Sequence, residues 1–306
     1  EQELADLTAG TRGTAEFPEG TQQVFLPMGA GDSRLTLVDA EGNVTRTAPV
    51  DVVFPLLHGP FGEDGTVQGL LEMADLHYVG CGVTASAVGM DKHFMKVTFE
   101  SAGLEVGPYE VVTNRQWEHE DREQILERVL KLGFPMFVKP TRAGSSFGIT
   151  KVDSVEELVP AIEEARRHDP KIIIEAGIVG REMPRASYPG EIEVVDQDHG
   201  FYDFEAKYVS ESSAVTVCPA NLPQDVQNRL RELAVKAFLA LDGEGLSRAD
   251  FFYTEDGRLV INEVNTMPGF TPISMYKTMW ENTGISYTDL ISELLTLAME
   301  RPLGLR

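Results

Sequence analysis

The feature that most constrains the fold is a short apolar segment that leads into a glycine-rich loop and then a helix. Val50–Leu57 (VDVVFPLL) is almost continuously apolar, which is typical of a strand buried on both faces of a parallel sheet. His58–Gly65 follows with three glycines and two acidic residues, and Thr66–Leu76 has helical apolar spacing. This β-loop-α unit predicts an α/β fold with a ligand site at the carboxyl end of the strand.

Along the rest of the chain, predicted helices and strands also follow one another, which indicates mixed sheets. Helices are expected at Met90–Ser101, Glu120–Leu132, Val155–Arg167 and Pro223–Leu241, and strands at Phe134–Pro140, Ile149–Val152, Lys171–Glu175, Leu246–Tyr253 and Arg258–Val264. Asp256-Gly257 predicts a hairpin turn between the last two strands. At roughly 150 residues per domain, 306 residues predict two or three domains.

Two segments do not fit this pattern. Residues 1–34 are polar and rich in turn residues, without the strand-turn-helix opening of an α/β domain. Gly180–Arg185 is polar and turn-like, although it follows closely on an apolar strand.

Charge and cysteine content exclude several classes of function. Lys and Arg number 26 against 49 Asp and Glu, so the formal charge is −23, and such a surface repels nucleic acid and anionic membranes. No apolar run approaches the ~20 residues of a membrane span. Two cysteines are too few for a disulfide framework, and the first residues are acidic where a secretory signal is basic. We therefore expect a cytoplasmic protein with small-molecule partners.

The predicted hairpin carries the most specific chemistry. Residues i and i+2 share a face of a strand, so Arg248 joins Asp250 on one strand and Glu263 joins Asn265 on the other. If the two faces coincide, the oxygen ligands Asp250, Glu263 and Asn265 favour Mg²⁺ or Mn²⁺. The alternative is a hairpin with an ordinary polar, solvent-facing side.

Three further clusters each allow a functional and a structural interpretation. Lys139 precedes the loop Gly144–Gly148, which could cradle a phosphate or be a flexible hairpin. His58 lies at a predicted strand end and is either a hydrogen-bonded structural residue or part of a site. The aromatic segment Phe201–Tyr208 is either a packed loop or a lid.

Seven motifs, in order between about residues 50 and 280, resemble those of the D-alanine–D-alanine ligase family of ATP-grasp enzymes. They are His58-Gly59 with Gly62–Gly65, Met90–Lys92, Phe137–Pro140 with Gly144–Ser146, Gly180–Glu182, Tyr202–Tyr208, Arg248–Phe252 and Asn262–Gly269.

The resemblance implies a three-domain ATP-grasp fold. Its expected parts are an N-terminal parallel-sheet substrate domain (1–91), a central nucleotide-binding domain (92–182) and a C-terminal catalytic domain (183–306). The family's Gly-Gly-x-Ser-x-Glu segment does not precede Val50, so the N-terminal domain is expected to lack its first strand and helix. The apolar strand that continues Gly-Arg-Glu in the family is also absent after Glu182, which suggests ordered fragments numbered consecutively.

The resemblance also implies residue roles. ATP would be bound by Lys92, Lys139, Glu175, Glu182 and Lys207, and two Mg²⁺ ions, for which Mn²⁺ can substitute, by Asp250, Glu263 and Asn265. Arg248 and the Gly269 N–H would stabilise the tetrahedral oxyanion, with Ser145 and Tyr208 also catalytic. His58 and Ser274 would contact substrate, Ser274 at the second substrate's carboxylate.

The implied reaction joins two D-alanine molecules through a D-alanyl phosphate, for peptidoglycan precursor synthesis by a homodimer. Tyr208 favours the dipeptide over the D-alanyl-D-lactate product of related enzymes. The alternatives are a D-alanine–D-lactate ligase and a non-catalytic nucleotide-binding ATP-grasp relative.

Overall fold

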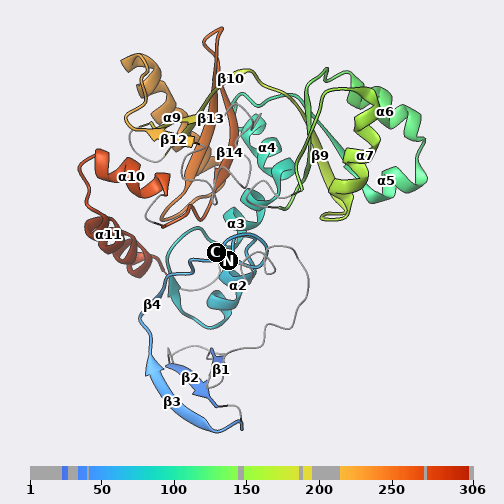
Figure 1. Cartoon of the computed structure of the whole chain (residues 1–306). Helices are drawn as coiled ribbons and strands as arrows, with labels where there is room; N and C mark the ends of the chain where they lie inside the picture. The colour runs from blue at the N-terminus through green and yellow to red at the C-terminus, as the bar shows by residue number, and fades with distance from the viewer. Residues whose placement is uncertain are drawn as a thin grey trace.

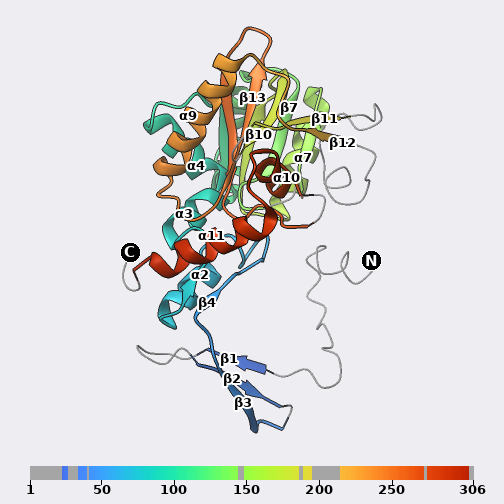
Figure 2. The ribbon, with the colours of Figure 1, turned by 90° about the vertical axis from the view of Figure 1, so that its left-hand side faces the viewer.

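The structure, a computed structural model, describes residues 23–26, 34–39, 41–143, 148–185, 189–194, 214–271 and 274–302. Figures 1 and 2 show these residues arranged in successive lobes. The strands are β1 (Gln23–Phe25), β2 (Arg34–Val38), β3 (Val44–Pro49), β4 (Val52–Val53), β5 (His77–Tyr78), β6 (Tyr109–Thr113), β7 (Met136–Pro140), β8 (Thr150–Val152), β9 (Lys171–Ala176), β10 (Gly180–Arg185), β11 (Glu191–Val194), β12 (Ala214–Val217), β13 (Arg248–Thr254) and β14 (Leu259–Asn265). The helices are α2 (Thr66–Met73), α3 (Val83–Met90), α4 (Lys92–Ser101), α5 (Asn114–His119), α6 (Arg122–Leu130), α7 (Val155–Arg166), α9 (Gln224–Ala240), α10 (Met275–Asn282) and α11 (Tyr287–Glu300).

The central lobe is an antiparallel sheet in the order β6-β9-β7-β8, backed by α5, α6 and α7. Side chains alternate across each strand, so Val138 and Ile174 face the helices and are fully buried. On the opposite face, Lys139 and Glu175 point away from that core, toward α4. One side of this sheet is therefore apolar and structural, and the other carries charge.

The C-terminal lobe is built on the antiparallel sheet β10-β13-β14. Phe251 and Ile261 oppose each other and pack with α9 residues such as Leu230 in a core that also takes in Met95 and Phe99 of α4. The predicted helices and strands of the central and C-terminal lobes are confirmed, with their ends within two residues of the expected positions.

The first lobe differs from its prediction in the length of one strand. Of Val50–Leu57, only Val52–Val53 forms a strand, β4, and it pairs with β5 in the expected parallel direction. Pro55 has no N–H for a ladder, and the N–H groups of Leu56 and Leu57 donate to carbonyls two residues earlier. The backbone therefore turns where the apolar composition predicts a longer strand. Before it, β1, β2 and β3 form a small antiparallel sheet at the far end of the molecule.

The polar segment Gly180–Arg185 is a strand, so its turn-like prediction is wrong. As β10 it pairs with β13 in unbroken register from Gly180 opposite Thr254 to Arg185 opposite Ala249. Pairing to a central strand supplies the hydrogen bonds that its polar composition does not reveal. The predicted boundary between the second and third domains, at Glu182, falls within β10; the division into 1–91, 92–182 and 183–306 stays a prediction.

Helix α4 connects the two larger lobes. Asp91 caps its N-terminus by accepting from the N–H groups of His93 and Phe94. Met95 and Phe99 enter the C-terminal core, whereas Lys92 and Lys96 lie four residues apart on the side that meets the central sheet. Figure 1 shows α4 between the two sheets. Among the described helices, none has the length and hydropathy needed to cross a membrane.

The burial of α4 predicts a large effect of truncating Phe99. Phe99→Ala removes a fully buried ring from the C-terminal core, and we expect it to lower the free energy of unfolding by about 3–5 kcal/mol in urea. Val97→Ala, on the exposed side of the same helix, serves as the control and should cost less than about 0.5 kcal/mol. Equal losses for the two variants would contradict the placement of α4.

Candidate active site

The register of β13 and β14 brings the predicted polar residues onto one face. Arg248 lies opposite Asn265, and Asp250 lies opposite Glu263, so all four side chains share that face. Immediately beyond, the register shifts so that Phe251 opposes Ile261, and Asn262 is the extra residue of a bulge. The juxtaposition expected from the i, i+2 spacing is confirmed.

Arg248 and Asp250 form a tight pair on this face. Arg248 Nε lies 2.8 Å from Asp250 Oδ1, and Nη2 lies 2.7 Å from Oδ2. Asp250 is 2% exposed, so the two-pronged contact fixes the guanidinium plane with little freedom to rotate. A rigid guanidinium beside a pair of carboxylates can stabilise an oxyanion that forms in front of it.

Lys92 connects this face to the central lobe. Its ammonium donates to the carbonyl of Ala143, at 3.1 Å, and lies 3.8 Å from Glu263 Oε2. Its backbone N–H donates to the carbonyl of Thr141. The start of α4 is therefore anchored to the segment that follows β7, next to the charged face of β14.

Glu175 is held between two lysines. Its Oε1 lies 2.7 Å from the Lys96 ammonium, and Oε2 is paired with Lys139. Burial would raise the pKa of Glu175, but the charges of Lys139 and Lys96 outweigh it and hold that pKa well below its usual range. The sequence prediction named Glu175 and Lys139 and missed Lys96, whose four-residue spacing from Lys92 was the available signal.

The loop after β4 contributes a buried carboxyl group and an imidazole. Glu63, 9% exposed, accepts from the N–H of Gly59 at 2.5 Å. Burial is the main cause that raises the pKa of Glu63 to about 7; the charge of Glu263 adds to it, and Lys92 and Arg248 oppose it. The buried carboxyl group of Glu63 is therefore within electrostatic reach of Glu263, Lys92 and Arg248.

His58 lies in the same loop and near the same face. Desolvation lowers the pKa of His58, a backbone hydrogen bond at Met267 opposes this shift, and the charge of Arg248 adds to it. The imidazole is therefore mainly neutral at neutral pH and stands near the loop that follows β14.

That loop brings Gly269 and Ser274 together. Asn265 Oδ1 accepts from the N–H of Met267 at 3.0 Å, which starts the turn. Ser274 Oγ accepts from the N–H of Thr271 at 2.9 Å. A Cβ at position 269 would lie 2.8 Å from Ser274 Oγ, so the chain needs glycine to keep this close approach.

Four predicted site residues are not placed by their side chains. Ser145, Lys207 and Tyr208 lie outside the described residues, and for Glu182 the structure describes the backbone of β10, opposite Phe252. Their assignment rests on the sequence.

The predicted metal ligands share one donor chemistry. Asp250 and Glu263 supply carboxylates and Asn265 an amide, all hard oxygen donors. The described residues contain no cluster of three or more His, Cys, Asp or Glu side chains that could hold a metal ion by themselves. These two carboxylates and one amide therefore supply only part of a coordination shell. A divalent cation here would thus complete its coordination with substrate phosphates and water, as Mg²⁺ commonly does. The residues fit such an ion.

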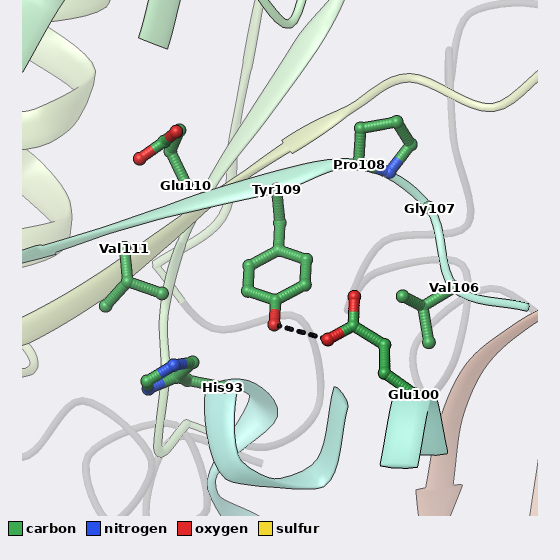
Figure 3. Close-up of a pocket in the computed structure, with 8 residues that line it drawn as sticks. All are labelled: His93, Glu100, Val106, Gly107, Pro108, Tyr109, Glu110 and Val111. Atoms are coloured by element: carbon green, nitrogen blue, oxygen red, sulfur yellow. Dashed lines mark hydrogen bonds between the residues drawn. The ribbon is translucent and has the colours of Figure 1, made fainter. Parts of the chain in front are cut away.

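A separate hollow of about 530 Å³ opens beside α4 and contains none of the predicted site residues. Its lining is drawn in Figure 3 and consists of His93, Glu100, Val106, Gly107, Pro108, Tyr109, Glu110 and Val111. The Tyr109 ring reaches from β6 toward α4, where its hydroxyl donates to Glu100 at 3.3 Å.

Comparisons with known proteins give consistent matches over nearly the whole chain. The family model described as D-ala D-ala ligase N-terminus matches residues 9–81, and the model described as D-ala D-ala ligase C-terminus matches residues 98–296. A D-alanine–D-alanine ligase of Kocuria rhizophila is 57% identical, covering 100% of this chain and 83% of that protein. One of Streptomyces coelicolor is 50% identical, covering 100% and 81%.

Solved structures agree with these matches. The D-alanine–D-alanine ligase of Coxiella burnetii superposes with a TM-score of 0.76 at 30% identity, covering 92% of this chain and 74% of that one. The VanG D-Ala:D-Ser ligase of Enterococcus faecalis gives 0.77 at 35% identity, covering 90% and 79%.

The raised pKa of Glu63 predicts a pH-dependent stability in the metal-free protein. The pKa of the Glu63 carboxyl group is about 7 in the folded protein and 4.5 ordinarily. Its contribution to the free energy of unfolding is therefore largest below pH 4.5 and is lost as the pH rises through 7. Between pH 5 and pH 8, wild type should therefore lose up to about 3 kcal/mol more of its unfolding free energy than Glu63→Gln. Urea unfolding at both values measures this.

The control for this experiment is Glu127→Gln, which changes an exposed glutamate of α6. It should follow the wild-type pH profile. A Glu63→Gln profile parallel to that of wild type would show that Glu63 does not titrate in this range.

Proposed function

The chain belongs to the D-alanine–D-alanine ligase family, and we propose that the shared face of β13 and β14, with the lysines around it, is its catalytic centre. As a member of this ATP-grasp family the protein is an ATP-dependent ligase that joins two D-alanine molecules, and its dipeptide product is used for peptidoglycan. The observation that carries the placement of the centre is the register that sets Arg248, Asp250, Glu263 and Asn265 side by side.

The nucleotide would bind between the central sheet and this face. Lys92 and Lys139 project into that space from α4 and β7, and each offers an ammonium to a phosphate. Glu175, Glu182 and Lys207 are proposed to complete the nucleotide contacts, with Glu175 and Glu182 on the adenosine side. Against the overall charge of −23, these lysines are a local concentration of positive charge, which suits an anionic ligand.

The proposed metal ligands are Asp250, Glu263 and Asn265, holding two Mg²⁺ ions, with Mn²⁺ as a substitute. The family uses ATP with a divalent metal; such a metal, when bound, neutralises the charge that phosphate oxygens carry during transfer. The chain's own part is to fix Asp250 through Arg248 and Glu263 through Lys92, so that both carboxylates are already positioned before substrate arrives.

The reaction proceeds in two steps in this proposal. The carboxylate of the first D-alanine attacks the γ-phosphorus of ATP, which releases ADP and gives D-alanyl phosphate. The amine of the second D-alanine then attacks the acyl carbon, and after the tetrahedral intermediate collapses, inorganic phosphate leaves. Arg248 and the Gly269 N–H would donate to the oxyanion of that intermediate.

Substrate positioning falls to the surrounding loops. Ser274, held by Thr271 and adjacent to Gly269, would receive the carboxylate of the second D-alanine. His58 stands near Arg248 and is proposed to contact substrate. Ser145 and Tyr208 would act at the first D-alanine, with Phe201–Tyr208 as the lid that excludes water from the acyl phosphate.

Cellular context is a further part of the proposal. Both cysteines, Cys81 and Cys218, are free thiols, which suits a reducing cytoplasm. The partners are D-alanine and ATP, and we propose a homodimer without nucleic acid or membrane contacts.

The ligation assay tests the activity directly. With ATP and a divalent metal, phosphate release should depend on D-alanine, and mass spectrometry should detect D-alanyl-D-alanine when D-alanine, D-lactate and D-serine are offered together at neutral pH. Tight ATP binding without D-alanine-dependent release would instead indicate a nucleotide-binding relative. A dominant D-lactate product would indicate the depsipeptide ligase.

Glu263→Gln tests the metal assignment. The change keeps the volume but removes a carboxylate charge, so we expect kcat/KM to fall by more than about 100-fold with the fold retained. Glu255→Gln, in the exposed turn of the same hairpin, is the control and should stay close to wild type. Full activity of Glu263→Gln at saturating Mg²⁺ would refute the assignment.

A further inference from the structure

Lys96 is a buried charged residue to which none of the roles above is assigned. It is 3% exposed, and its ammonium lies 2.7 Å from Glu175 Oε1. An ammonium so far from water is stable only with a close charged partner, so the position of Glu175 and that of Lys96 depend on each other.

Glu175 and the two lysines that bond it are a group of three charges, two positive and one negative. Lys96 and Lys139 each bond one of its oxygens, so one negative charge faces two positive charges. With Lys96 absent, Lys139 and Glu175 would form a neutral pair. With Lys96 present, the three groups carry a net charge of about +1 on the face of the sheet that the nucleotide phosphates approach.

The fold keeps Lys96 in this arrangement from several directions. On one side, the neighbouring Met95 and Phe99 anchor α4 in the C-terminal core. On the other, Glu175 belongs to β9, where it lies opposite Tyr109 in the sheet. The Tyr109 ring lies 5.9 Å from the Lys96 ammonium, and its hydroxyl donates to Glu100 of α4. Figure 3 shows the Tyr109 ring reaching toward α4, where its hydroxyl meets Glu100.

We propose that Lys96 is a positioning residue for nucleotide binding: by engaging one oxygen of Glu175, it keeps the Lys139 ammonium directed at, and electrostatically available to, a nucleotide phosphate. This inference rests on the proposed role of Lys139 in binding ATP. Lys96 itself touches no substrate; it acts through Glu175.

The test variant is Lys96→Met, which matches the length of the side chain and leaves Glu175 paired with Lys139, so no lone charge is buried. We expect KM for ATP to rise about tenfold or more, with kcat at saturating ATP within about twofold of wild type. KM for D-alanine should not change. Isothermal titration with ADP and Mg²⁺ should show the same loss of affinity.

Two further variants separate positioning from structural support. Lys171→Met removes another ion pair between the central sheet and α4, at Asp91, and it should lower stability without raising KM for ATP. In a Glu175→Gln background, Lys96→Met should have much less effect on KM than it has in wild type, because the carboxylate through which it acts is gone. Lys96→Arg should restore part of the ATP affinity by restoring the charge.

Several results would overturn the inference. They are an unchanged KM for ATP in Lys96→Met, an equal effect in the Glu175→Gln background, and an equal rise in Lys171→Met. Lys139→Met distinguishes this failure from that of the proposed function. If Lys139→Met leaves KM for ATP unchanged, the nucleotide role of Lys139 is wrong, whatever Lys96→Met does.

Discussion

The arrangement of the two larger lobes depends on the ion pairs that the Glu175 carboxylate forms with Lys96 and Lys139. One lysine comes from α4, whose apolar side is built into the C-terminal core, and the other from the central sheet. An ion cluster this dry tolerates little displacement, because any gap would leave a buried charge without its partner. The charged face of one sheet is thereby held opposite the charged face of the other, and the space between them is where we propose that the nucleotide binds.

Much of the C-terminal site could be predicted from the sequence because it is local. Arg248 with Asp250, and Glu263 with Asn265, share faces through the two-residue period of a strand, and Asp256-Gly257 identifies the turn between them. What the spacing left open was whether the two faces coincide. Register, which includes a bulge, decides that, and a sequence alone does not specify it.

The remaining parts depend on contacts between distant segments. The charge of Glu263 raises the pKa of Glu63, and Lys96 forms an ion pair with Glu175, although the two residues of each pair are far apart in the sequence. Gly180–Arg185 forms a strand because β13 is there to pair with it, and Val50–Leu57 shortens because Pro55 cannot extend the ladder. The composition of each segment does not indicate which distant segments will pack or pair with it. The resemblance to the family implied roles for residues such as Glu175 and Lys139, but it implied none for Lys96.

The bulge at Asn262 has a consequence for how this gene can change. At the carboxyl end of β14, Glu263 and Asn265 face the site and Val264 faces the core; on the other side of Asn262 the alternation is offset by one residue, so that Ile261 also faces the core. The extra residue thus acts as a phase shift between two patterns. Removing Asn262 alone would restore the regular alternation and leave Ile261 toward the core and Glu263 toward the site, whereas losing a paired residue of the strand would turn the residues on one side of it to the opposite face. Asn262 is therefore the one position of this strand at which a single-residue deletion would keep the paired residues on their present faces.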